Sequence, residues 1–251
     1  MRGDILKKKL MVLCAVAIMI STCLTGCKMN SGKIRFGSAG IGGTYQIFGD
    51  TFANLISSKS KKYNIEVKTT AGSAANLRLL SKDYIQMAVA QMDLINDAYN
   101  RTGIFENDKK YQGYRAVASL YTEACQIVVP ADSDIQSMDD LEGKKVCIGE
   151  EESGTEQNAL QILNAYGLNE RLVDTVNLNY TDAAKKLKSG DIDAFFCPAG
   201  VQTTVINELS KQCKIRLVSL DQKGVSRLKK SYKFYTEYTI PAGTYVNQTK
   251  E

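Results

Sequence analysis

The chain contains no histidine and no tryptophan among its 251 residues. Without histidine it can form no Ser-His-Asp triad, no Cys-His dyad and no histidine-ligated metal site. None of its last four cysteines belongs to a C-x-x-C pair, which argues against a zinc site. Chemistry by carboxylate, lysine or tyrosine side chains stays open. These absences argue against most kinds of hydrolase, and we expect no catalytic residues, no metal and no cofactor.

The N-terminus has the order of features typical of an exported lipoprotein. Basic residues within positions 2–9 precede an apolar run over residues 10–20, which is too short to span a bilayer, where about 20 residues are needed. The run fits the central region of a secretory signal. Residues 24–27, Leu-Thr-Gly-Cys, resemble the bacterial lipobox. An apolar helix on a soluble protein is the alternative. We predict a signal peptide over residues 1–26 and a lipidated Cys27.

Little net charge is left once this signal is removed. The signal holds four basic residues and one acidic residue, so 28 basic and 26 acidic residues remain. A net charge of +2 gives no case for nucleic acid binding. Of the four later cysteines, Cys125, Cys147 and Cys197 lie in apolar runs typical of buried strands, and Cys213 does not. Export would permit disulfides, and the pairing stays open.

One strand–loop–helix unit occurs twice. Residues 34–56 and 145–167 each hold an apolar run, a loop of small residues and a helical pattern, and Gly43-Thr44 aligns with Gly154-Thr155. A helix N-terminus has unpaired N–H groups and a partial positive charge, and glycine lets a ligand approach closely. Each copy is therefore a candidate anion site. Together they predict a small acidic ligand held between two lobes.

A second pair of segments supports this internal duplication. Residues 77–91 and 184–198 align without a gap as a helix end, a turn centred on Asp83 or Gly190, and an apolar strand. The alternative is that any α/β chain repeats such units. The alternation of short strands with helices predicts an α/β fold with mainly parallel sheets flanked by helices. Ligands bind at the carboxyl ends of the strands in such sheets.

Four local expectations concern the segments around these loops. Ser73 is expected to cap a helix over residues 74–80, and residues 85–90 to form a buried strand. Residues 115–130 are expected to form a long strand that leaves one lobe and enters the next. The acidic side chains of residues 150–152 are expected to point outward and complement a positive helix end.

The glycine-rich loop over residues 37–43 superficially resembles a nucleotide-binding loop. It has no lysine before Thr44, and its glycine spacing differs from the dinucleotide pattern. We therefore favour a carboxylate or another small anion as its ligand.

Six motifs follow one another along the chain: GIGGTYQIFG (40–49), TTAGSAANLRLL (69–80), AVAQMD (88–93), ESGTEQNALQIL (152–163), GDIDAFFCPAG (190–200) and TIPAGTY (239–245). Together they resemble the TAXI family, the solute receptors of a class of TRAP transporters. The similarity covers about residues 33–251.

The resemblance implies a type II periplasmic-binding-protein fold with two α/β lobes. Lobe 1 would comprise residues 33–122 and lobe 2 residues 123–251, after a tether over residues 27–32. Such receptors pass their solute to the membrane subunits of a TRAP permease, which an ion gradient drives. Known ligands of the family are carboxylates such as glutamate and 2-oxoglutarate. The chain would be an extracytoplasmic monomer, anchored to the membrane through Cys27.

The resemblance also places the ligand contacts on these residues: Gly43, Thr44, Tyr45, Ser73, Asn76, Gln91, Ser153, Gly154, Thr155, Ala199 and Gly200. The backbone amides of Thr44 and Thr155 would bind carboxylate oxygens. Tyr45, Asn76 and Gln91 would supply neutral hydrogen bonds that orient the ligand.

The chain departs from the family near its end. Family members continue past the TIPAGTY motif with a strand that returns to the first lobe, whereas this sequence stops at Glu251. The return crossing is therefore expected to be missing, which would leave unpaired strand edges and uncovered apolar surface. Two other functions stay open: an enzyme on the same scaffold, and a surface lipoprotein or antigen with a vestigial pocket.

Overall fold

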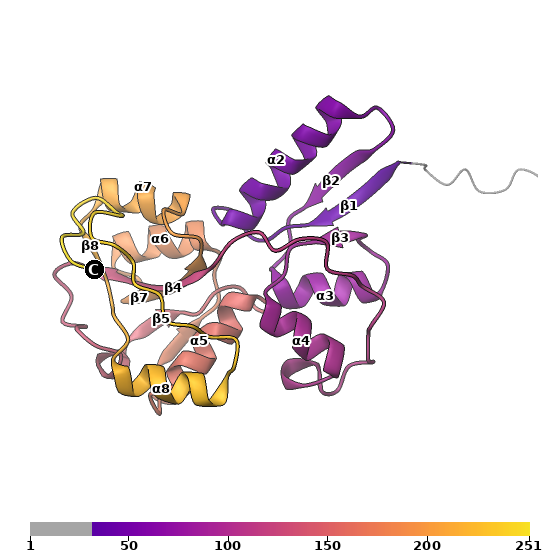
Figure 1. Ribbon diagram of the computed structural model, residues 1–251. Coiled ribbons are helices and arrows are strands. Elements are labelled where there is room, and N and C mark those ends of the chain that lie inside the picture. The colour runs from indigo at the N-terminus through magenta and orange to yellow at the C-terminus, as the bar shows by residue number, and fades with distance from the viewer. Residues whose placement is uncertain (1–31) are drawn as a thin grey trace, which may run out of the picture.

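The computed structural model describes residues 32–251, which form two lobes, each a β-sheet flanked by helices (Figure 1). The α/β fold predicted from the sequence is confirmed. The predicted signal peptide and Cys27 lie outside the described residues. Within residues 32–251, no helix has the length and apolar character needed to cross a membrane.

Lobe 1 is built on a three-stranded parallel sheet in the order β2-β1-β3. Its elements are β1 (Lys33–Gly37), α2 (Thr44–Lys59), β2 (Asn64–Lys68), α3 (Ser73–Ser81), β3 (Met87–Ala88), α4 (Met92–Asn100) and a 3-10 turn (Gly103–Phe105). Helix α2 lies on one side of the sheet and α3 and α4 on the other (Figure 1). The Phe36 ring of β1 packs against Phe48 and Phe52 of α2, with centroids 6.1 and 5.8 Å away.

Lobe 2 is built on a five-stranded sheet in the order β6-β5-β7-β4-β8. Its elements are β4 (Ala124–Pro130), a 3-10 turn (Asp139–Leu141), β5 (Lys145–Cys147), α5 (Gly154–Ala165), β6 (Asp174–Val176), α6 (Tyr180–Ser189), β7 (Ala194–Ala199), α7 (Thr204–Gln212), β8 (Ile215–Leu217) and α8 (Gln222–Ser231). Strands β5, β6 and β7 are parallel, and β4 runs antiparallel to β7 and β8.

The topology agrees with the predicted internal duplication. The order β2-β1-β3 in lobe 1 matches β6-β5-β7 in lobe 2, and all four pairings are parallel. The aligned turns also match, because Asp83 has φ 57° and Gly190 has φ 78°, both in the left-handed region. In each copy the helix that follows the first strand starts at the carboxyl edge of the sheet. The two lobes therefore present equivalent loops to one another.

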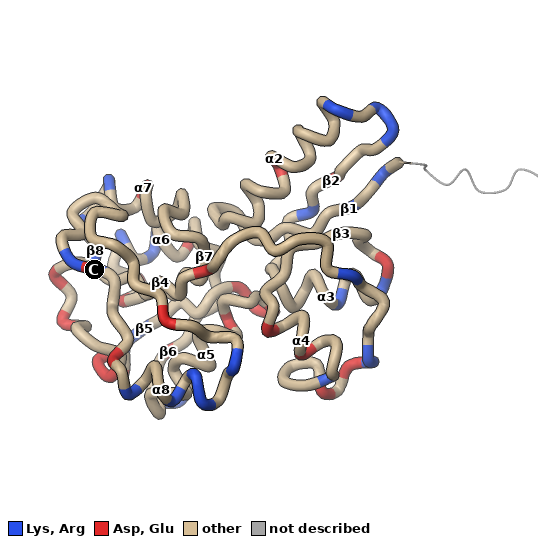
Figure 2. The backbone as a smooth tube through the Cα atoms, viewed as in Figure 1, with Lys and Arg blue, Asp and Glu red and all other residues tan. Residues whose placement is uncertain are grey.

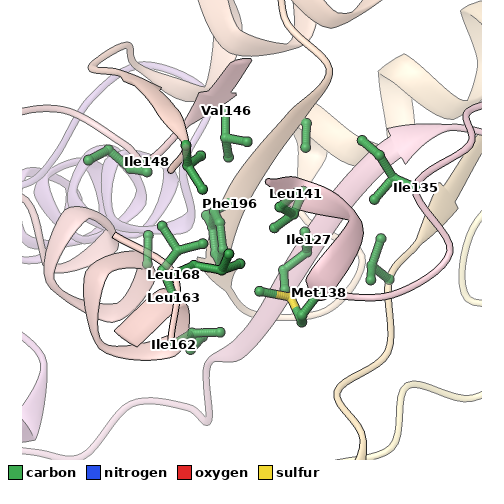
Figure 3. Packing of buried hydrophobic residues seen from close by; sticks show 14 of the residues in the cluster. Ile127, Ile135, Met138, Leu141, Val146, Ile148, Ile162, Leu163, Leu168 and Phe196 are labelled. Carbon is green, nitrogen blue, oxygen red and sulfur yellow. The ribbon is translucent and has the colours of Figure 1, made fainter. Parts of the chain in front are cut away.

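The core of lobe 2 lies on both faces of its sheet. Phe195 and Phe196 are adjacent on β7 and fully buried, so their side chains point to opposite faces. Phe196 packs among Ile127, Ile162 and other apolar side chains beneath α5 (Figure 3), whereas Phe195 packs with the residues of α6 and α7. The four cysteines of the described chain are free, and two of them, at positions 147 and 197, are buried in this core.

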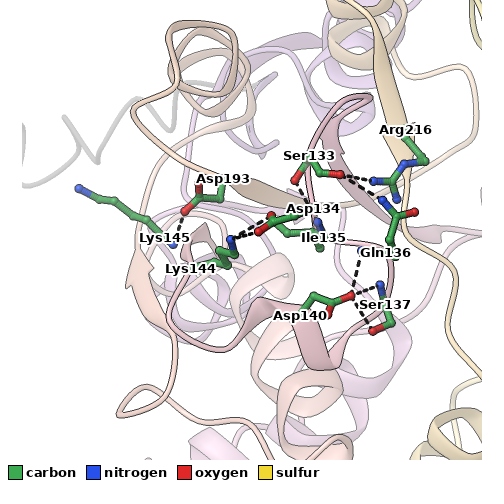
Figure 4. A network of polar contacts seen from close by, with 10 residues as sticks. All are labelled: Ser133, Asp134, Ile135, Gln136, Ser137, Asp140, Lys144, Lys145, Asp193 and Arg216. Atoms are coloured by element: carbon green, nitrogen blue, oxygen red, sulfur yellow. Dashed lines mark hydrogen bonds and ion pairs between the residues drawn. The ribbon is translucent and has the colours of Figure 1, made fainter.

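A polar network closes the opposite end of lobe 2, where β5 begins (Figure 4). The Asp140 carboxylate accepts hydrogen bonds from the Ser137 hydroxyl and from the backbone N–H groups of Gln136 and Ser137, at 2.8–2.9 Å. These bonds, the Ser137 hydroxyl first, hold the pKa of Asp140 below its ordinary value. The Lys145 N–H donates to Asp193 at 2.7 Å. The amino ends of these strands are thus occupied, and the carboxyl ends face lobe 1.

Two sequence predictions in lobe 1 are wrong in detail. Ser73 does not cap α3 but is its first residue, because Gly72 occupies the N-cap with φ 127°, which favours glycine. The Ser73 hydroxyl instead accepts from the Gln91 N–H at 3.0 Å. The strand expected over residues 85–90 is only the two-residue β3, because it is an edge strand that pairs with β1 alone.

The long strand expected over residues 115–130 is also wrong in its first half. Strand β4 begins at Ala124, and residues 106–123 form neither helix nor strand as they pass from one lobe to the other (Figure 1). No neighbouring strand of the described chain pairs with this segment. Its apolar residues are correspondingly open to solvent, and Val117 is 84% exposed.

Candidate functional site

Five helices begin around one small cavity between the lobes. Their N-cap residues all line it: Gly43 (α2), Gly72 (α3), Gln91 (α4), Ser153 (α5) and Asn179 (α6). The cavity has a volume of about 50 Å³. A water molecule occupies roughly 10–15 Å³ on this measure, so the space holds only a few waters. The structure is therefore a closed conformation in which the lobes nearly meet.

The helices of the two lobes are capped differently. In lobe 2, the Ser153 hydroxyl accepts from the Glu156 N–H at 2.9 Å, and the Asn179 side chain accepts from the Asp182 N–H at 2.9 Å. In lobe 1, α2 and α3 start after Gly43 and Gly72, and within the described chain no side chain caps them. Apart from the Ala75 N–H of α3, which donates to the Glu152 carbonyl of lobe 2 at 3.1 Å, their first N–H groups have no partner within the helix. These groups are available to an anion.

No lysine or arginine is among the residues that the structure places around this cavity. Figure 2 shows several basic residues at the outer end of α2 and on α8. An anion bound here would therefore be stabilised by helix N-termini and hydroxyl groups and not by a basic side chain.

A carboxylate that the sequence analysis did not single out, Glu123, lies in the cavity wall. Its Oε2 accepts from the Gln91 side-chain amide at 2.9 Å, and its Oε1 lies 3.4 Å from the Tyr121 hydroxyl. The Tyr45 side chain also lies beside it. Burial raises the pKa of Glu123 to about 7. Burial, followed by the charge of Glu123, raises the pKa of Tyr45 as well.

The acidic run at residues 150–152 does not point outward as a whole, so that expectation is wrong. Glu150 lines the cavity, and burial raises its pKa. Glu152 reaches lobe 1 and forms an ion pair with Arg78 at 3.0 Å. Only Glu151 is exposed without such a contact. The tight turn over Glu152, with φ 63°, directs these neighbouring side chains in different directions.

Direct hydrogen bonds join the two lobes around the cavity. The Gln91 side-chain amide donates to Asn158 of α5 at 2.8 Å, and the Thr181 hydroxyl of α6 donates to the Ile41 carbonyl at 3.1 Å. Gly154 packs so closely on Gln91 that a Cβ there would overlap the Gln91 Oε1. A larger residue at position 154 would therefore force the Gln91 side chain away from its position in this closed form.

The structure brings together nine of the eleven predicted ligand-binding residues as lining of the cavity. They are Gly43, Thr44, Tyr45, Ser73, Gln91, Ser153, Gly154, Thr155 and Ala199. Gly200 lies just outside, where a Cβ would meet the Tyr121 ring at 3.5 Å. Asn76 lies behind the wall: its side-chain amide donates to the Ser38 and Val89 carbonyls at 2.7 and 2.9 Å.

Sequence reasoning also missed several polar residues of the wall, among them Glu123, Tyr180 and Asn179. Tyr180 donates to the Pro198 carbonyl at 2.8 Å and lies 2.6 Å from the Thr155 hydroxyl, so it fixes the first turn of α5. Asn179 had a usable signal, because asparagine is a preferred N-cap and an apolar-periodic segment follows it. Glu123 and Tyr180 gave no local signal.

Two α/β lobes that close over a small cavity at helix N-termini define the fold of type II periplasmic binding proteins. The chain is similar to the alkanesulfonate-binding protein SsuA from Xanthomonas axonopodis pv. citri, bound to MOPS, with 18% identity, a TM-score of 0.50 and coverage of 75% of this chain and 60% of that one. It is also similar to a binding protein component of a phosphonate ABC transporter from Pseudomonas aeruginosa (12% identity, TM-score 0.51, coverage 80% and 73%).

A third similar structure is the GluR0 ligand-binding core in complex with L-glutamate, with 11% identity, a TM-score of 0.50 and coverage of 80% of this chain and 92% of that one. The model of the NMT1-like family matches residues 36–251, and the chain belongs to this family. It spans 60% of the length of the Xanthomonas protein.

Proposed function

We propose that the protein is an extracytoplasmic solute receptor that binds a small carboxylate between its lobes. The observation that carries this proposal is the cavity itself, where the uncapped N-termini of α2 and α3 face those of α5 and α6. Such N-termini favour anions, and a closed site between two lobes suits a molecule of a few heavy atoms. The glutamate bound by the similar GluR0 core is an example of this ligand class.

In this proposal the ligand carboxylate lies between the first turns of α2 and α5. The backbone amides of Thr44 and Thr155 donate to its oxygens, and Gly43 and Gly154 allow the close approach. Tyr45, Ser73, Gln91 and the Ser153 hydroxyl supply orienting hydrogen bonds, and Ala199 completes the floor, with Gly200 just behind it. We assign Asn76 a positioning role instead, because its side chain already joins the ends of β1 and β3.

Binding works through the difference between an open and a closed conformation. The hydrogen bonds of Gln91 with Asn158 and of Thr181 with Ile41 cross from one lobe to the other, so they form only on closure. A ligand that touches both lobes stabilises the closed state by its differential affinity, with no covalent step. A permease that binds the closed form then receives the loaded receptor.

We further propose that this permease is of the TRAP type and that the receptor is tethered through lipidated Cys27. The six motifs that resemble the TAXI family support the TRAP assignment, and the family match over residues 36–251 is compatible with it. The test is uptake into membrane vesicles that hold the receptor and its permease. Uptake driven by an ion gradient without ATP supports the assignment, and uptake that requires ATP contradicts it.

The ligand class is tested by thermal unfolding of the purified protein in the presence of amino, keto and dicarboxylic acids. A ligand at 100 times its dissociation constant adds about 2.7 kcal/mol to the free energy of unfolding, which gives a clear rise in Tm. A rise with at least one carboxylic acid is the expected result. A cooperative transition that no acid shifts would contradict the proposal.

A further inference from the structure

The carboxylate of Glu123 has no basic partner in the cavity. The groups that face it are Tyr45 of α2, Gln91 and Asp93 of α4, Tyr180 of α6, Cys197 of β7, and Tyr121 and Cys125 of its own segment. Of these, Asp93 is the other carboxyl group, and its charge raises the pKa of Glu123 further. Once Glu123 is ionised, the surrounding described residues therefore do not neutralise its negative charge.

A second hydrogen-bond acceptor, the side-chain oxygen of Gln91, lies beside Glu123 and has no donor among the described residues. The Gln91 side-chain nitrogen donates to both Glu123 and Asn158, at 2.9 and 2.8 Å, which fixes the orientation of the amide. Its oxygen, Oε1, is then directed to the Ser73 and Gly154 side of the cavity. This oxygen is buried, and no described residue donates to it. A buried acceptor without a donor destabilises the closed state unless a ligand supplies one.

These two observations constrain the ligand. A purely anionic molecule at the helix N-termini would be repelled by an ionised Glu123, and it would bring no donor to Gln91. An ammonium group has a positive charge and three N–H donors, which suits both acceptors. The N-termini of α2 and α3 and the Glu123 carboxylate border the same cavity, so one small molecule can reach both.

We propose that Glu123 is a specificity-determining residue. It makes the site select a zwitterionic amino acid over the corresponding keto acid, and over a dicarboxylic acid that has no ammonium group. Its carboxylate and the Gln91 Oε1 accept from the ligand ammonium, while the helix N-termini bind the ligand carboxylate. This inference rests on the proposed receptor function and names the ligand class within it.

The two ligand classes then require opposite protonation states of Glu123. An amino acid binds the ionised form, so its affinity rises with pH until the carboxyl is fully ionised. A keto acid binds the protonated form and loses affinity over the same range. With the pKa of Glu123 near 7, each dissociation constant changes about tenfold between pH 6 and pH 8, in opposite directions. The preference for the amino acid therefore increases about 100-fold.

Matched pairs of ligands test this directly. Dissociation constants of glutamate and 2-oxoglutarate, and of alanine and pyruvate, are measured by calorimetry at pH 6 and pH 8 for the purified full chain. The expected result is the opposite pH dependence, with the amino acid favoured at pH 8. In Glu123→Gln, which keeps the side-chain shape, the amino acid preference falls at least tenfold and the opposite pH trends disappear. The exposed Glu106→Gln serves as the matched control and behaves as the wild type.

The outcomes separate this inference from the function on which it rests. If the wild type binds keto acids as well as amino acids at both pH values, or if Glu123→Gln keeps the wild-type preference, the role of Glu123 is wrong and the receptor function stands. If no acid of either class binds, the receptor function itself is wrong. Should Glu123→Gln not fold, the pH dependence of the wild type and of Glu123→Asp, which retains the charge, decides the question.

Discussion

Gln91 and Asn158 lie 67 residues apart and belong to different lobes, and the Gln91 side-chain amide donates to the Asn158 Oδ1 at 2.8 Å. The Asn158 side chain in turn donates to the Tyr235 hydroxyl at 2.7 Å and to Asp93 at 3.3 Å. One asparagine in α5 thereby joins the N-terminus of α4 to the C-terminal segment of the chain. Loss of this hydrogen bond is therefore the most direct sign that the lobes have opened.

Asn158→Ala should weaken ligand binding without unfolding either lobe. Loss of its interlobe hydrogen bonds with Gln91 and Asp93 removes at least about 1 kcal/mol from the closed state, which corresponds to about a fivefold or larger increase in the dissociation constant. Calorimetric titration measures it. Asn207→Ala is the control, because the Asn207 side chain donates to the Gln202 carbonyl at 2.7 Å inside lobe 2. Equal losses of affinity in the two variants would contradict the role of Asn158 in closure.

Gly154→Ala should hinder closure, because the Gln91 side chain would have to leave its hydrogen bonds with Glu123 and Asn158. The new Cβ would overlap the Gln91 Oε1 and lie 3.0 Å from the Ser73 hydroxyl, both in the opposite lobe, while lobe 2 itself tolerates alanine in the first turn of a helix. We expect small-angle X-ray scattering to show that this variant stays in an extended form, and that added ligand does not make it more compact.

The control for this variant is Gly143→Ala, where φ is 73° but nothing lies within 4 Å of the new Cβ. It should lower Tm through backbone strain and still allow ligand-induced compaction. Compaction of Gly154→Ala by ligand would show that the lobes do not need to approach as closely as they do here.

The partly buried Glu123 should make the closed protein less stable as pH rises. Burial raises its folded-state pKa to about 7, above the ordinary value of about 4.3 in the unfolded chain. Between these values the folded state binds the extra proton, so the free energy of unfolding falls with pH by up to about 1.4 kcal/mol per unit. Burial raises the pKa of Asp93 too, which adds a fall of the same sign.

Urea unfolding of the wild type and of Glu123→Gln between pH 5 and pH 8 checks this slope. We expect the wild type to lose stability relative to the variant as pH rises to about 7, and no further relative loss above it. A difference between the two proteins that is constant with pH would show that Glu123 titrates normally.

Phe196→Ala should destabilise lobe 2 by about 3–5 kcal/mol, because it removes a fully buried aromatic ring and leaves a cavity between β7 and α5. Denaturant unfolding, monitored by far-ultraviolet circular dichroism, measures this loss in the free energy of unfolding. Phe234→Ala is the matched control, since that ring is 48% exposed and its loss should cost well under half as much. Similar costs for both rings would be incompatible with the packing shown in Figure 3.

The strand–loop–helix units could be predicted because their signals are local. The helices at Thr44–Lys59 and Gly154–Ala165 start within the aligned pairs Gly43-Thr44 and Gly154-Thr155, directly after loops of small residues. The alignment of Asp83 with Gly190 also identified two turns that share a left-handed residue. Local sequence determined these features, so no distant contact was needed to find them.

The parts that could not be predicted depend on contacts between distant residues. Ser73 has the propensity of an N-cap, but its hydroxyl accepts from Gln91, 18 residues later, while Gly72 takes the cap. In the sequence, Glu123 is only one polar residue near an apolar strand. Its partner Gln91 lies 32 residues away, and only the folded structure shows that its carboxylate faces the cavity.

The central claim is that the N-terminus of α2 binds a carboxylate, and Thr44→Pro tests it most directly. Thr44 is the first residue of α2, where proline is tolerated, and the extended Gly43 before it suits a following proline. The variant therefore removes the N–H donor and retains the helix. Thr204→Pro makes the same change at the start of α7, which is outside the cavity.

The measurement is a calorimetric titration of the wild type, Thr44→Pro and Thr204→Pro with the carboxylic acid that gives the largest thermal shift. A hydrogen bond to a charged group is worth about 1.5–3 kcal/mol, so Thr44→Pro should bind roughly 10- to 100-fold more weakly, while Thr204→Pro binds as the wild type does. Unchanged affinity in a folded Thr44→Pro variant would contradict the account.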